Sequence, residues 1–435
     1  MEKPNHIFIP GKNWKLSLAE FSSLLQTRKI NFEMYSISKE FFAIGNGPER
    51  DFNDIDSLGG FIKIGKINTE ISTKDLENAS ILKNKEAKNR ISKEIESNNL
   101  IRDLFENPSR KIVFGVSVYC AENSLRTNTR RIQRFVGSIV KRELDRHGKK
   151  SNFIGFPRDR KNPQLSHIEV LKRKLVENKA EILLCIDKEQ TFVATTSAVH
   201  NPFEFQKRDV GKPVQRKIFA ISPRLARIII NLAACTEGNT LLDPFCGVGT
   251  ILQEALLSKA KTIGVDINRW CVEATNRNLQ WLKNEYSLKN AEFRVLQGDV
   301  AKLSQKMGRK QVDCVATEPD LGPALRQMPT TAYATRIVNK LEPLYFTLLE
   351  EAWKVLREEG RLVFTSPYIK TRSGKPVVMN IGQKAIEVGF NSVYFFERKL
   401  FSKNSGSYQK LKDTSSIIDV EKRHKIGRKI HVFQK

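Results

Sequence analysis

The C-terminal half of this chain alternates short apolar runs with amphipathic helical runs, and this alternation restricts its fold more than any other feature. Strand-like runs lie at 240–245, 262–267, 293–299, 312–317 and 361–367, and helix-like runs lie at 250–260, 272–286 and 340–360. Such a succession is typical of a mostly parallel sheet covered by helices on both faces. We therefore predict a doubly wound α/β domain over 214–435.

The N-terminal half lacks that regular alternation and predicts a different class of fold. Residues 1–72 contain a strand-like run, a helical run and three further strand-like runs separated by turn residues. A highly charged helical stretch over 73–108 is expected to be a linker rather than part of a core. Residues 109–205 mix strands with two helices. We expect α+β domains over 1–72 and 109–205.

The charge of the chain favours a polyanionic partner. The 74 Lys and Arg residues against 48 Asp and Glu residues give a formal net charge of +26. A membrane surface is the weaker choice, because no apolar run approaches the roughly 20 residues of a spanning helix. The N-terminus also lacks the order of a signal peptide. We therefore expect a cytoplasmic, nucleic-acid-binding protein, with a monomer favoured.

The N-terminal half concentrates its excess of basic charge in 124–174, where 15 Lys and Arg residues stand against 4 Asp and Glu residues. An apolar stripe at helical spacing within this segment, from Ile132 to Leu144, leaves the opposite face free for phosphates. A solvated helix face would have the same pattern. The candidate RNA-binding residues are Arg130, Arg131, Arg134, Lys141, Arg142, Lys149 and Lys150.

Three carboxylates follow successive strands of the predicted C-terminal sheet. Asp243 precedes a turn with Gly247 and Gly249, while Asp266 and Asp299 end the next two strands. Asp266 stands near the spacing at which an acidic residue binds ribose hydroxyls, and Asp299 could accept from an adenine amino group. Each Asp could equally be a helix cap. A third glycine at Leu252 would complete a dinucleotide fingerprint. Its absence favours a nucleoside cofactor without phosphates, which points to S-adenosylmethionine rather than NAD.

The turn DPFCGVGTILQEA resembles motif I of Rossmann-like methyltransferases that modify exocyclic amines of nucleic acid bases. The run 219–233 is similar to the element that precedes motif I and closes over the methionine part of the cofactor. The runs GSIVKREL, LSHIEVLKRKL and FVATTSAVHNPFEFQKRDVGKP resemble a THUMP domain with a preceding ferredoxin-like domain. Together they resemble the THUMP-containing tRNA guanine-N2 methyltransferases of archaea and eukaryotes. The resemblance implies cofactor contacts from Asp243, Phe245, Gly247, Gly249, Thr250, Asp266, Ile267 and Asp299.

In that family the fourth strand ends in D-P-P-Y or N-P-P-Y, whereas this chain has TEPDLG at 317–322. Matching Gly322 to the glycine that often follows the motif gives Glu318 the acidic place and Pro319 and Asp320 the two proline places. The candidate catalytic residues are therefore Glu318, Pro319 and Asp320. The other register begins at Thr317. Neither register places an aromatic residue in the motif, so Tyr333, Phe346 and Tyr368 become candidates for stacking on the base.

These features predict an S-adenosylmethionine-dependent RNA methyltransferase, acting on guanine N2 of tRNA. The alternatives are an adenine-N6 methyltransferase of DNA or rRNA, and an RNA-binding module on a catalytically weak methyltransferase fold. The six cysteines lie scattered with no C-x-x-C pair, so we expect reduced, largely buried thiols and no metal site.

Overall fold

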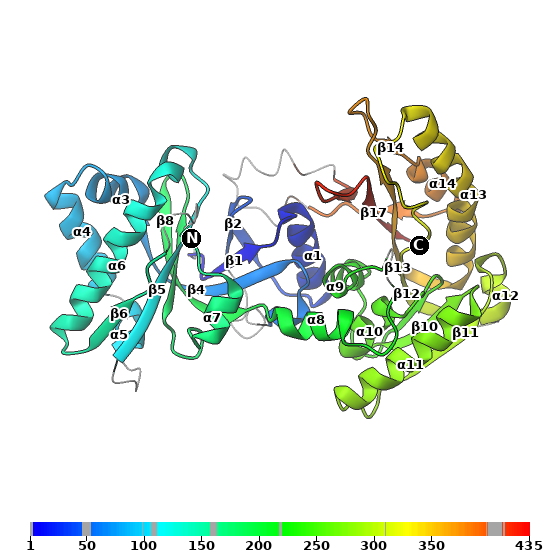
Figure 1. Cartoon of the computed structure of the whole chain (residues 1–435), viewed down its shortest axis with the longest axis horizontal. Helices are drawn as coiled ribbons and strands as arrows, with labels where there is room; N and C mark the ends of the chain where they lie inside the picture. Colours follow the sequence, from blue (N-terminus) through cyan, green and yellow to red (C-terminus); the bar gives the residue numbers. More distant parts are fainter. Residues whose placement is uncertain are drawn as a thin grey trace.

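The computed structural model describes residues 3–45, 54–97, 99–105, 111–156, 163–216, 220–308, 310–396, 398, 411 and 414–435. These residues form two sheets that lie one after the other along the long axis of the molecule (Figure 1). The N-terminal half of the chain builds one sheet and the C-terminal half builds the other. No helix among the described residues is both long enough and apolar enough to cross a membrane.

The elements of the N-terminal half follow one another in this order: β1 (His6–Pro10), α1 (Trp14–Thr27), β2 (Glu33–Ile37), β3 (Phe42–Gly45), β4 (Phe61–Ser72), α3 (Thr73–Ser80), α4 (Lys85–Glu96), α5 (Asn99–Phe105), β5 (Lys111–Cys120), α6 (Thr129–Arg146), β6 (Lys150–Phe153), α7 (His167–Lys172), β7 (Glu181–Ile186), β8 (Gln190–Val199) and α8 (Pro202–Val210). Short 3-10 helices lie at Ile55–Ser57 and Asn123–Asn128.

The long strand β4 joins the two predicted N-terminal domains in one sheet. The strand order is β2-β3-β1-β4-β8-β7-β5-β6. β4 pairs antiparallel with β1 on one side and with β8 on the other, from Lys63 opposite Val199 to Ser72 opposite Gln190. The first four strands therefore continue directly into the strands of the second predicted domain.

The expectation that 73–108 is a linker outside any core is wrong for the part that the structure describes. This part forms three helices, α3, α4 and α5, instead of one. Apolar residues on all three, among them Leu76, Ile91 and Leu104, are buried in the same core as the inner face of α6. The heavy charge of the segment hid this apolar stripe, because long charged side chains occupy the outer faces of the helices.

The elements of the C-terminal half are α9 (Pro223–Leu232), β9 (Thr240–Asp243), α10 (Thr250–Leu257), β10 (Lys261–Asp266), α11 (Arg269–Glu285), β11 (Phe293–Gln297), α12 (Leu303–Met307), β12 (Val312–Thr317), α13 (Thr331–Val355), β13 (Leu356–Ile369), β14 (Val377–Val378), α14 (Ile381–Val388), β15 (Asn391–Ser392), β16 (Ser416–Asp419) and β17 (Ile426–Gln434). A 3-10 helix lies at Val300–Lys302.

This second sheet confirms the predicted doubly wound α/β fold. Its strand order is β11-β10-β9-β12-β13-β17-β15, and the first five of these strands are parallel. One apolar core contains residues of α9, α10 and α11, and another contains residues of α12, α13 and α14, so helices cover both faces. The chain reverses direction across the sheet between β9 and β12, where a ligand site is expected in such folds.

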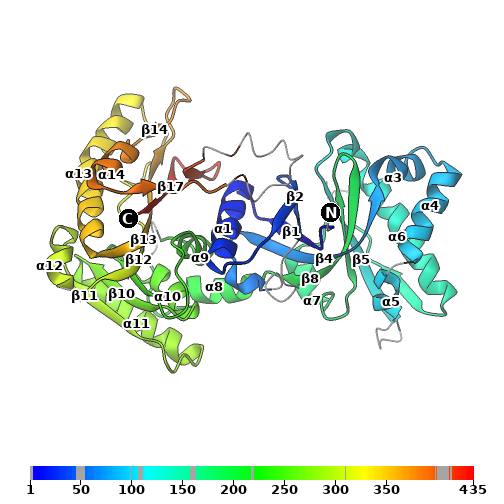
Figure 2. The same cartoon turned by 180° about the vertical axis from the view of Figure 1, so that it is seen from behind.

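The two halves share a core through α1 and α9, which lie side by side in both views (Figure 1, Figure 2). The buried carboxylate of Glu20 on α1 accepts hydrogen bonds from the N–H groups of Gly59 and Gly60 at 2.7 Å each and from Asn231 Nδ2 on α9 at 2.8 Å. A Cβ atom at Gly59 would lie 2.2 Å from the carbonyl oxygen of Arg224 on α9. The packing of the two halves thus depends on this close backbone approach.

Candidate active site

The end of β9 places a buried carboxylate next to the end of β12. Asp243 is 1% exposed, and its Oδ1 accepts hydrogen bonds from Thr317 Oγ1 at 2.6 Å and from the N–H of Phe245 at 3.1 Å. Burial raises the pKa of Asp243 from 3.8 to about 7, against the lowering effect of these two hydrogen bonds. Since the bond to Thr317 crosses from β9 to β12, it fixes the two strand ends that flank the change of direction.

The turn after β9 needs both of its glycines. Gly247 and Gly249 have φ angles of 54° and 85°, in the left-handed region that residues with a side chain seldom adopt. A Cβ atom at Gly249 would also lie 2.9 Å from Thr275 Cγ2 on α11, while one at Gly247 would meet no atom within 4 Å. Space therefore remains beside Gly247 for a ligand to approach the backbone.

Asp266, at the end of β10, holds this turn in place. Its Oδ2 accepts a hydrogen bond from the N–H of Gly247 at 2.9 Å, and its Oδ1 accepts one from the N–H of Asn268 at 2.9 Å. The Cys271 thiol also interacts with this side chain, and a carboxylate offers about four acceptor positions, so Asp266 keeps acceptor capacity for a ribose hydroxyl. Ile267, the next residue, is 67% exposed. The contact of Ile267 with the cofactor therefore stays a prediction.

Asp299 acts as a cap in this structure. Its Oδ1 accepts a hydrogen bond from the N–H of Ala301 at 3.0 Å, at the start of the 3-10 helix that follows β11. The side chain is exposed at the same edge of the sheet as Asp243 and Asp266. Its contact with an adenine amino group therefore stays a prediction.

A cavity of about 60 Å³ lies between these strand ends. It brings together the predicted residues Asp243, Phe245, Gly247, Thr250 and Glu318. The full lining consists of Arg216, Ala220, Ile221, Asp243, Phe245, Cys246, Gly247, Val248, Thr250, Ile251 and Glu318. Ala220 and Ile221 belong to the run before α9 that the sequence associated with the methionine part, whereas 217–219 lie outside the described residues.

Two cations beside this cavity were not found from the sequence. Arg216 contributes to its lining. Lys212 is 3% exposed and donates a hydrogen bond from Nζ to Thr250 Oγ1 at 2.9 Å. Burial lowers the pKa of Lys212, against the raising effect of Asp209 and Glu254. Lys212 lies in the run that the sequence associated with a THUMP domain, and Arg216 follows that run, so neither was assigned to the cofactor site.

Glu318 follows β12 and forms a buried ion pair with Arg428 on β17. Arg428 Nε lies 2.5 Å from Glu318 Oε2 and Nη2 lies 2.9 Å from Oε1, while Thr365 Oγ1 donates to Oε2 at 3.1 Å. The two side chains are 9% and 18% exposed. Sequence reasoning missed Arg428 because the pair joins strands 110 positions apart in the chain.

The next residues of the motif differ from one another in their surroundings. Pro319 is buried, whereas Asp320 is exposed and its Oδ1 accepts a hydrogen bond from the N–H of Gly322 at 2.9 Å. Tyr345 on α13 donates its hydroxyl to the carbonyl oxygen of Asp320 at 2.9 Å. Leu321, in the place of the family's aromatic residue, is 7% exposed and cannot stack on a base.

The three aromatic candidates for base stacking lie in different environments. Phe346 lies on α13 and packs against the apolar core, with Lys384 Nζ 5.7 Å from its ring centre. It therefore has a structural role. Tyr333 is 43% exposed at the start of α13. Tyr368 is half-buried on β13, opposite Val378 of β14. The last two stay candidates for contact with RNA.

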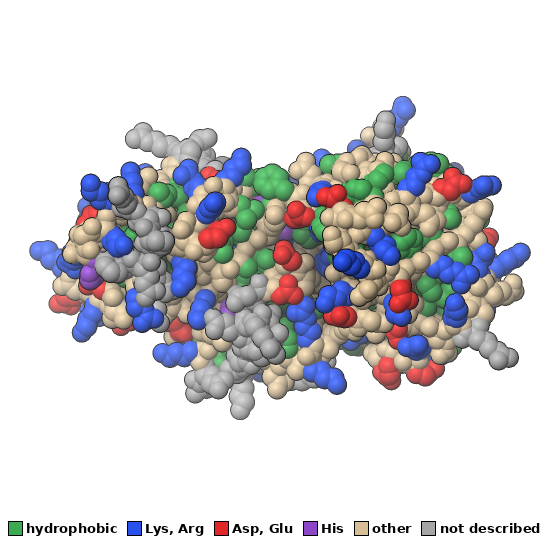
Figure 3. Space-filling model, turned by 90° about the horizontal axis from the view of Figure 1, so that it is seen from below, with side chains coloured by type: hydrophobic (Ala, Val, Ile, Leu, Met, Phe, Trp, Pro, Cys, Tyr) green, Lys and Arg blue, Asp and Glu red, His purple; other side chains and the backbone are tan. Residues whose placement is uncertain are grey.

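The predicted basic helix exists as α6, and most of its candidate residues face solvent. Arg131, Arg134, Lys141 and Lys150 are exposed, and Arg130 and Lys149 are half-buried. Arg142 differs, because its Nη2 donates to Ser92 Oγ at 3.1 Å and lies 3.5 Å from Glu96 Oε1, both on α4. That side chain joins two helices. Figure 3 shows basic side chains spread over both ends of one face of the molecule.

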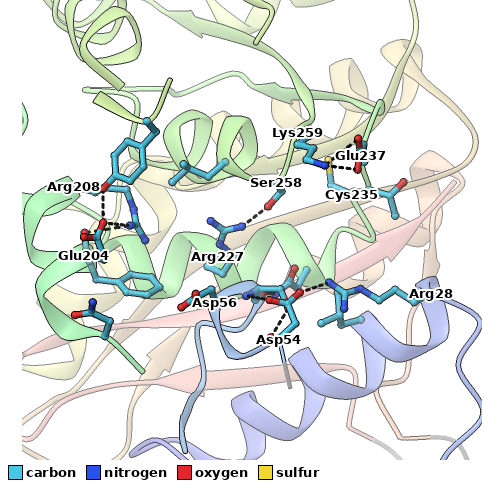
Figure 4. A pocket seen from close by; sticks show the side chains of 18 residues that line it. Arg28, Asp54, Asp56, Glu204, Arg208, Arg227, Cys235, Glu237, Ser258 and Lys259 are labelled. Atoms are coloured by element: carbon cyan, nitrogen blue, oxygen red, sulfur yellow. Dashed lines mark hydrogen bonds and ion pairs between the residues drawn. The ribbon is translucent and has the colours of Figure 1, made fainter. Parts of the chain in front are cut away.

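A larger cavity, of about 650 Å³, lies elsewhere and does not belong to this site. It is lined by the ends of α9 and α10, including Asn231 and Ser258 (Figure 4). Helices of a doubly wound fold run antiparallel to its parallel strands. The C-terminal ends of these helices therefore lie at the edge of the sheet opposite the strand ends that hold Asp243. Arg208 and Arg227 beside it both pair with the buried Glu254.

The described residues contain no group of three or more His, Cys, Asp or Glu side chains arranged to hold a metal ion. All six cysteines are free and buried, as the sequence predicted.

Comparisons with known proteins agree with this geometry. Residues 213–371 match the model of the RMKL-like methyltransferase domain. The solved structure of TrmN from Thermus thermophilus superposes with a TM-score of 0.50 at 14% identity, covering 99% of each chain. The similarity to TrmN shows a shared fold that extends over both halves of the molecule.

Relatives with higher identity match a smaller share of this chain. The tRNA (guanine(10)-N2)-dimethyltransferase of Methanothermobacter thermautotrophicus is 33% identical over 161 residues, which are 36% of this chain and 43% of the relative. The chain thus matches less than half of that protein's length. A probable tRNA (guanine(10)-N2)-dimethyltransferase of Methanothermococcus thermolithotrophicus is 30% identical over 144 residues, 33% of this chain and 79% of the relative. With this coverage and the matched domain, the chain belongs to the family of the tRNA (guanine(10)-N2)-dimethyltransferases.

Proposed function

We propose that this protein transfers methyl groups from S-adenosylmethionine to N2 of a guanine in tRNA. The observation that carries the proposal is the convergence of strand ends on one cavity. Asp243 and Glu318 line it from β9 and β12, and Asp266 on β10 holds Gly247 in its wall. The names of the relatives supply the substrate, guanine in tRNA.

The residues around the cavity fit the cofactor's chemistry. S-adenosylmethionine supplies an electrophilic methyl group on a sulfonium. Oxygen atoms of Asp243 and Glu318 offer hydrogen-bond acceptors to the ammonium group of the cofactor, and Arg216 provides positive charge for its carboxylate. The remaining acceptor capacity of Asp266 suits a ribose hydroxyl, and exposed Ile267 suits the adenine ring. Asp243, Gly247, Asp266, Ile267 and Arg216 would therefore hold the cofactor.

The turn at 318–320 supplies hydrogen-bond acceptors for the target amine. The lone pair of an exocyclic amine is delocalised into the base, so accepting its N–H bonds returns electron density to nitrogen. Glu318 already receives three hydrogen bonds, from Arg428 twice and from Thr365, and a carboxylate has about four acceptor positions. One position stays open for the amine. Asp320 is exposed and can accept the proton that leaves after transfer. Holding nitrogen, methyl carbon and sulfur in line then provides most of the acceleration.

The N-terminal half provides an RNA-binding surface in this proposal. Exposed Arg131, Arg134 and Lys141 recur on one face of α6, where they can contact phosphates of a folded RNA. Resemblance to a THUMP domain supports the same role for 109–205. The target guanine must leave its stack to reach Glu318. A tRNA substrate also supports a cytoplasmic location for the protein.

Mass spectrometry of nucleosides from tRNA incubated with protein and cofactor tests the proposal. We expect N2-methylated guanosine with the wild type and at least a tenfold slower yield with Glu318→Gln, which leaves tRNA binding unchanged. N6-methyladenine in DNA or rRNA, with unmodified tRNA, would contradict the substrate assignment.

A second candidate function is an RNA-binding module that has lost activity. Leu321 in the aromatic place and the ion pair that occupies Glu318 both favour it. A wild type that binds tRNA and cofactor but never methylates any of the substrates would establish this function instead.

A further inference from the structure

Three loops beyond the carboxyl end of β13 form a second basic surface, separate from α6. We define it by its described segments 322–340, 370–380 and 421–429 and name it the tip surface. These segments contain eleven Lys and Arg residues and one carboxylate, Glu421. Glu421 itself pairs with Arg423 at 3.1 Å. The net charge of the tip surface is therefore +10, more than a third of the formal charge of the whole chain.

Hydrogen bonds hold the three segments together as one surface. Arg372 donates Nε to the carbonyl oxygen of Met328 at 2.9 Å, and its N–H donates to the carbonyl oxygen of Pro329 at 3.0 Å. Lys370 donates Nζ to the carbonyl oxygen of Glu421 at 2.8 Å, and its N–H donates to that of Lys425 at 2.9 Å. The segments are therefore neighbours in space, although about 100 residues separate the first from the last.

The tip surface lies at the same edge of the sheet as the proposed active site. Thr317, the last residue of β12, pairs with Phe364, and β13 continues for five residues to Ile369. At about 3.3 Å per residue, the tip surface begins within about 17 Å of the end of β12. Arg428 belongs to the tip surface and pairs with Glu318, so the surface reaches the catalytic turn directly.

Exposed apolar side chains are interspersed with these cations. Met328, Tyr333 and Val378 are 37%, 43% and 40% exposed, and the guanidinium of Arg336 lies 5.6 Å from the ring centre of Tyr333. Cations that bind phosphates beside aromatic faces that stack on bases are the combination used to bind unpaired nucleotides. A solvated protein surface has no need of this combination.

We propose that the tip surface binds the phosphates and unstacked bases that flank the target guanine of the RNA substrate. This inference rests on the proposed function and adds a second contact region to it. In Figure 1, β14 and the start of α13 lie at the opposite end of the molecule from α6. One RNA can contact both surfaces only if it is large and folded, as tRNA is. α6 then contributes affinity, and the tip surface positions the target.

The test uses the full chain with three charge reversals on the tip surface: Arg326→Glu, Lys375→Glu and Lys422→Glu. All three residues are exposed, and the structure assigns their side chains no hydrogen bond or ion pair among the described residues. The matched control changes the charge equally at Arg277→Glu, Lys289→Glu and Lys310→Glu, exposed positions on α11, after α11 and before β12. Calorimetry with S-adenosylmethionine checks that both variants keep the cofactor site.

We expect the tip variant to methylate tRNA with kcat/KM at least tenfold below the control variant. We also expect its dependence of log affinity on log salt to fall by about two, because each lost phosphate contact removes 0.7–0.9. Equal behaviour of tip and control variants would overturn the proposal. A wild type that fails to bind or methylate tRNA would instead overturn the proposed function, and the tip assignment with it.

Discussion

Arg428 of β17 binds both carboxylate oxygens of Glu318, with Nε 2.5 Å from Oε2 and Nη2 2.9 Å from Oε1. This bidentate pair fixes the side chain that is proposed to accept the target amine. A carboxylate on a three-bond side chain has many rotamers, and the planar guanidinium selects one of them. Arg428 is thus a positioning residue, which acts through Glu318.

Removing this guanidinium is expected to slow methyl transfer without weakening cofactor binding. For Arg428→Ala we predict at least a tenfold lower kcat, together with a loss of about 3 kcal/mol in stability from the unpaired carboxylate. Arg428→Lys keeps the charge but loses the bidentate geometry. Its kcat should therefore lie between those of the wild type and Arg428→Ala. Single-turnover transfer and calorimetry with the cofactor measure the two effects separately.

Arg357→Ala is a suitable control for that experiment. Arg357, at the start of β13, pairs with Asp313 at the start of β12, the end of that strand opposite to Glu318, and the Arg357 side chain is 56% exposed. Exposed pairs contribute little to stability, so activity should stay within twofold of wild type. Equal losses in Arg428→Ala and Arg357→Ala would remove any special role for the pair with Glu318.

Asp266 and Asp299, which the sequence pattern did not distinguish, are expected to differ in function. Asp266 fixes the N–H of Gly247 in the cavity wall and keeps open acceptor positions, whereas Asp299 caps a short helix at an exposed place. We predict that Asp266→Ala weakens S-adenosylmethionine binding at least tenfold in calorimetry. Asp299→Ala should weaken it by less. The reverse order would show that the ribose site lies on β11.

The buried Glu20 is expected to make stability depend on pH. Burial raises its pKa from 4.5 to about 7, despite the hydrogen bonds from Gly59, Asn231 and Gly60. Between these two pH values the folded state binds more protons than the unfolded state, so stability falls as pH rises. Glu20→Gln removes this dependence. Relative to wild type, its free energy of unfolding should rise by up to about 3 kcal/mol from pH 4.5 to 7.

Urea unfolding at several pH values measures that difference. Glu273→Gln is the control, because Glu273 is 58% exposed and pairs with Arg269 on the same helix. This control should follow the wild-type pH profile. A Glu20→Gln profile parallel to wild type would mean that Glu20 is ionised in the fold across this range.

The sequence was sufficient to predict the methyltransferase sheet because its elements are local. Strand runs such as 312–317 are short and apolar, and each ends in the residues that line the site, so Asp243, Gly247 and Glu318 could be found by position alone. The single N-terminal sheet could not be predicted in this way. Its continuity depends on β4 pairing with β8, some 130 residues away, which no local pattern encodes.

The same limit applies to the site. Arg428 and Thr365 come from segments without a motif, and Lys212 comes from a run that the sequence associated with RNA binding. All three reach the site only through tertiary packing. Helical spacing alone also did not reveal that Arg142 contacts Ser92 on α4. The roles of Arg131 and its neighbours, and the likeness of 109–205 to a THUMP domain, stay predictions.

The exposed face of α6 gives the last prediction, which separates binding charge from structural charge on one helix. Arg131→Glu, Arg134→Glu and Lys141→Glu together should weaken tRNA binding at least tenfold near 100 mM salt. They should also lower the slope of log affinity against log salt by about two, since each phosphate contact contributes 0.7–0.9.

Arg142→Gln removes a charge from the same helix but breaks the bond to Ser92 on α4. It should therefore lower the melting temperature while leaving the salt slope unchanged. Filter binding over a salt series and thermal melts distinguish the two, and a salt slope that falls equally in both variants would mean that α6 binds RNA with a different face.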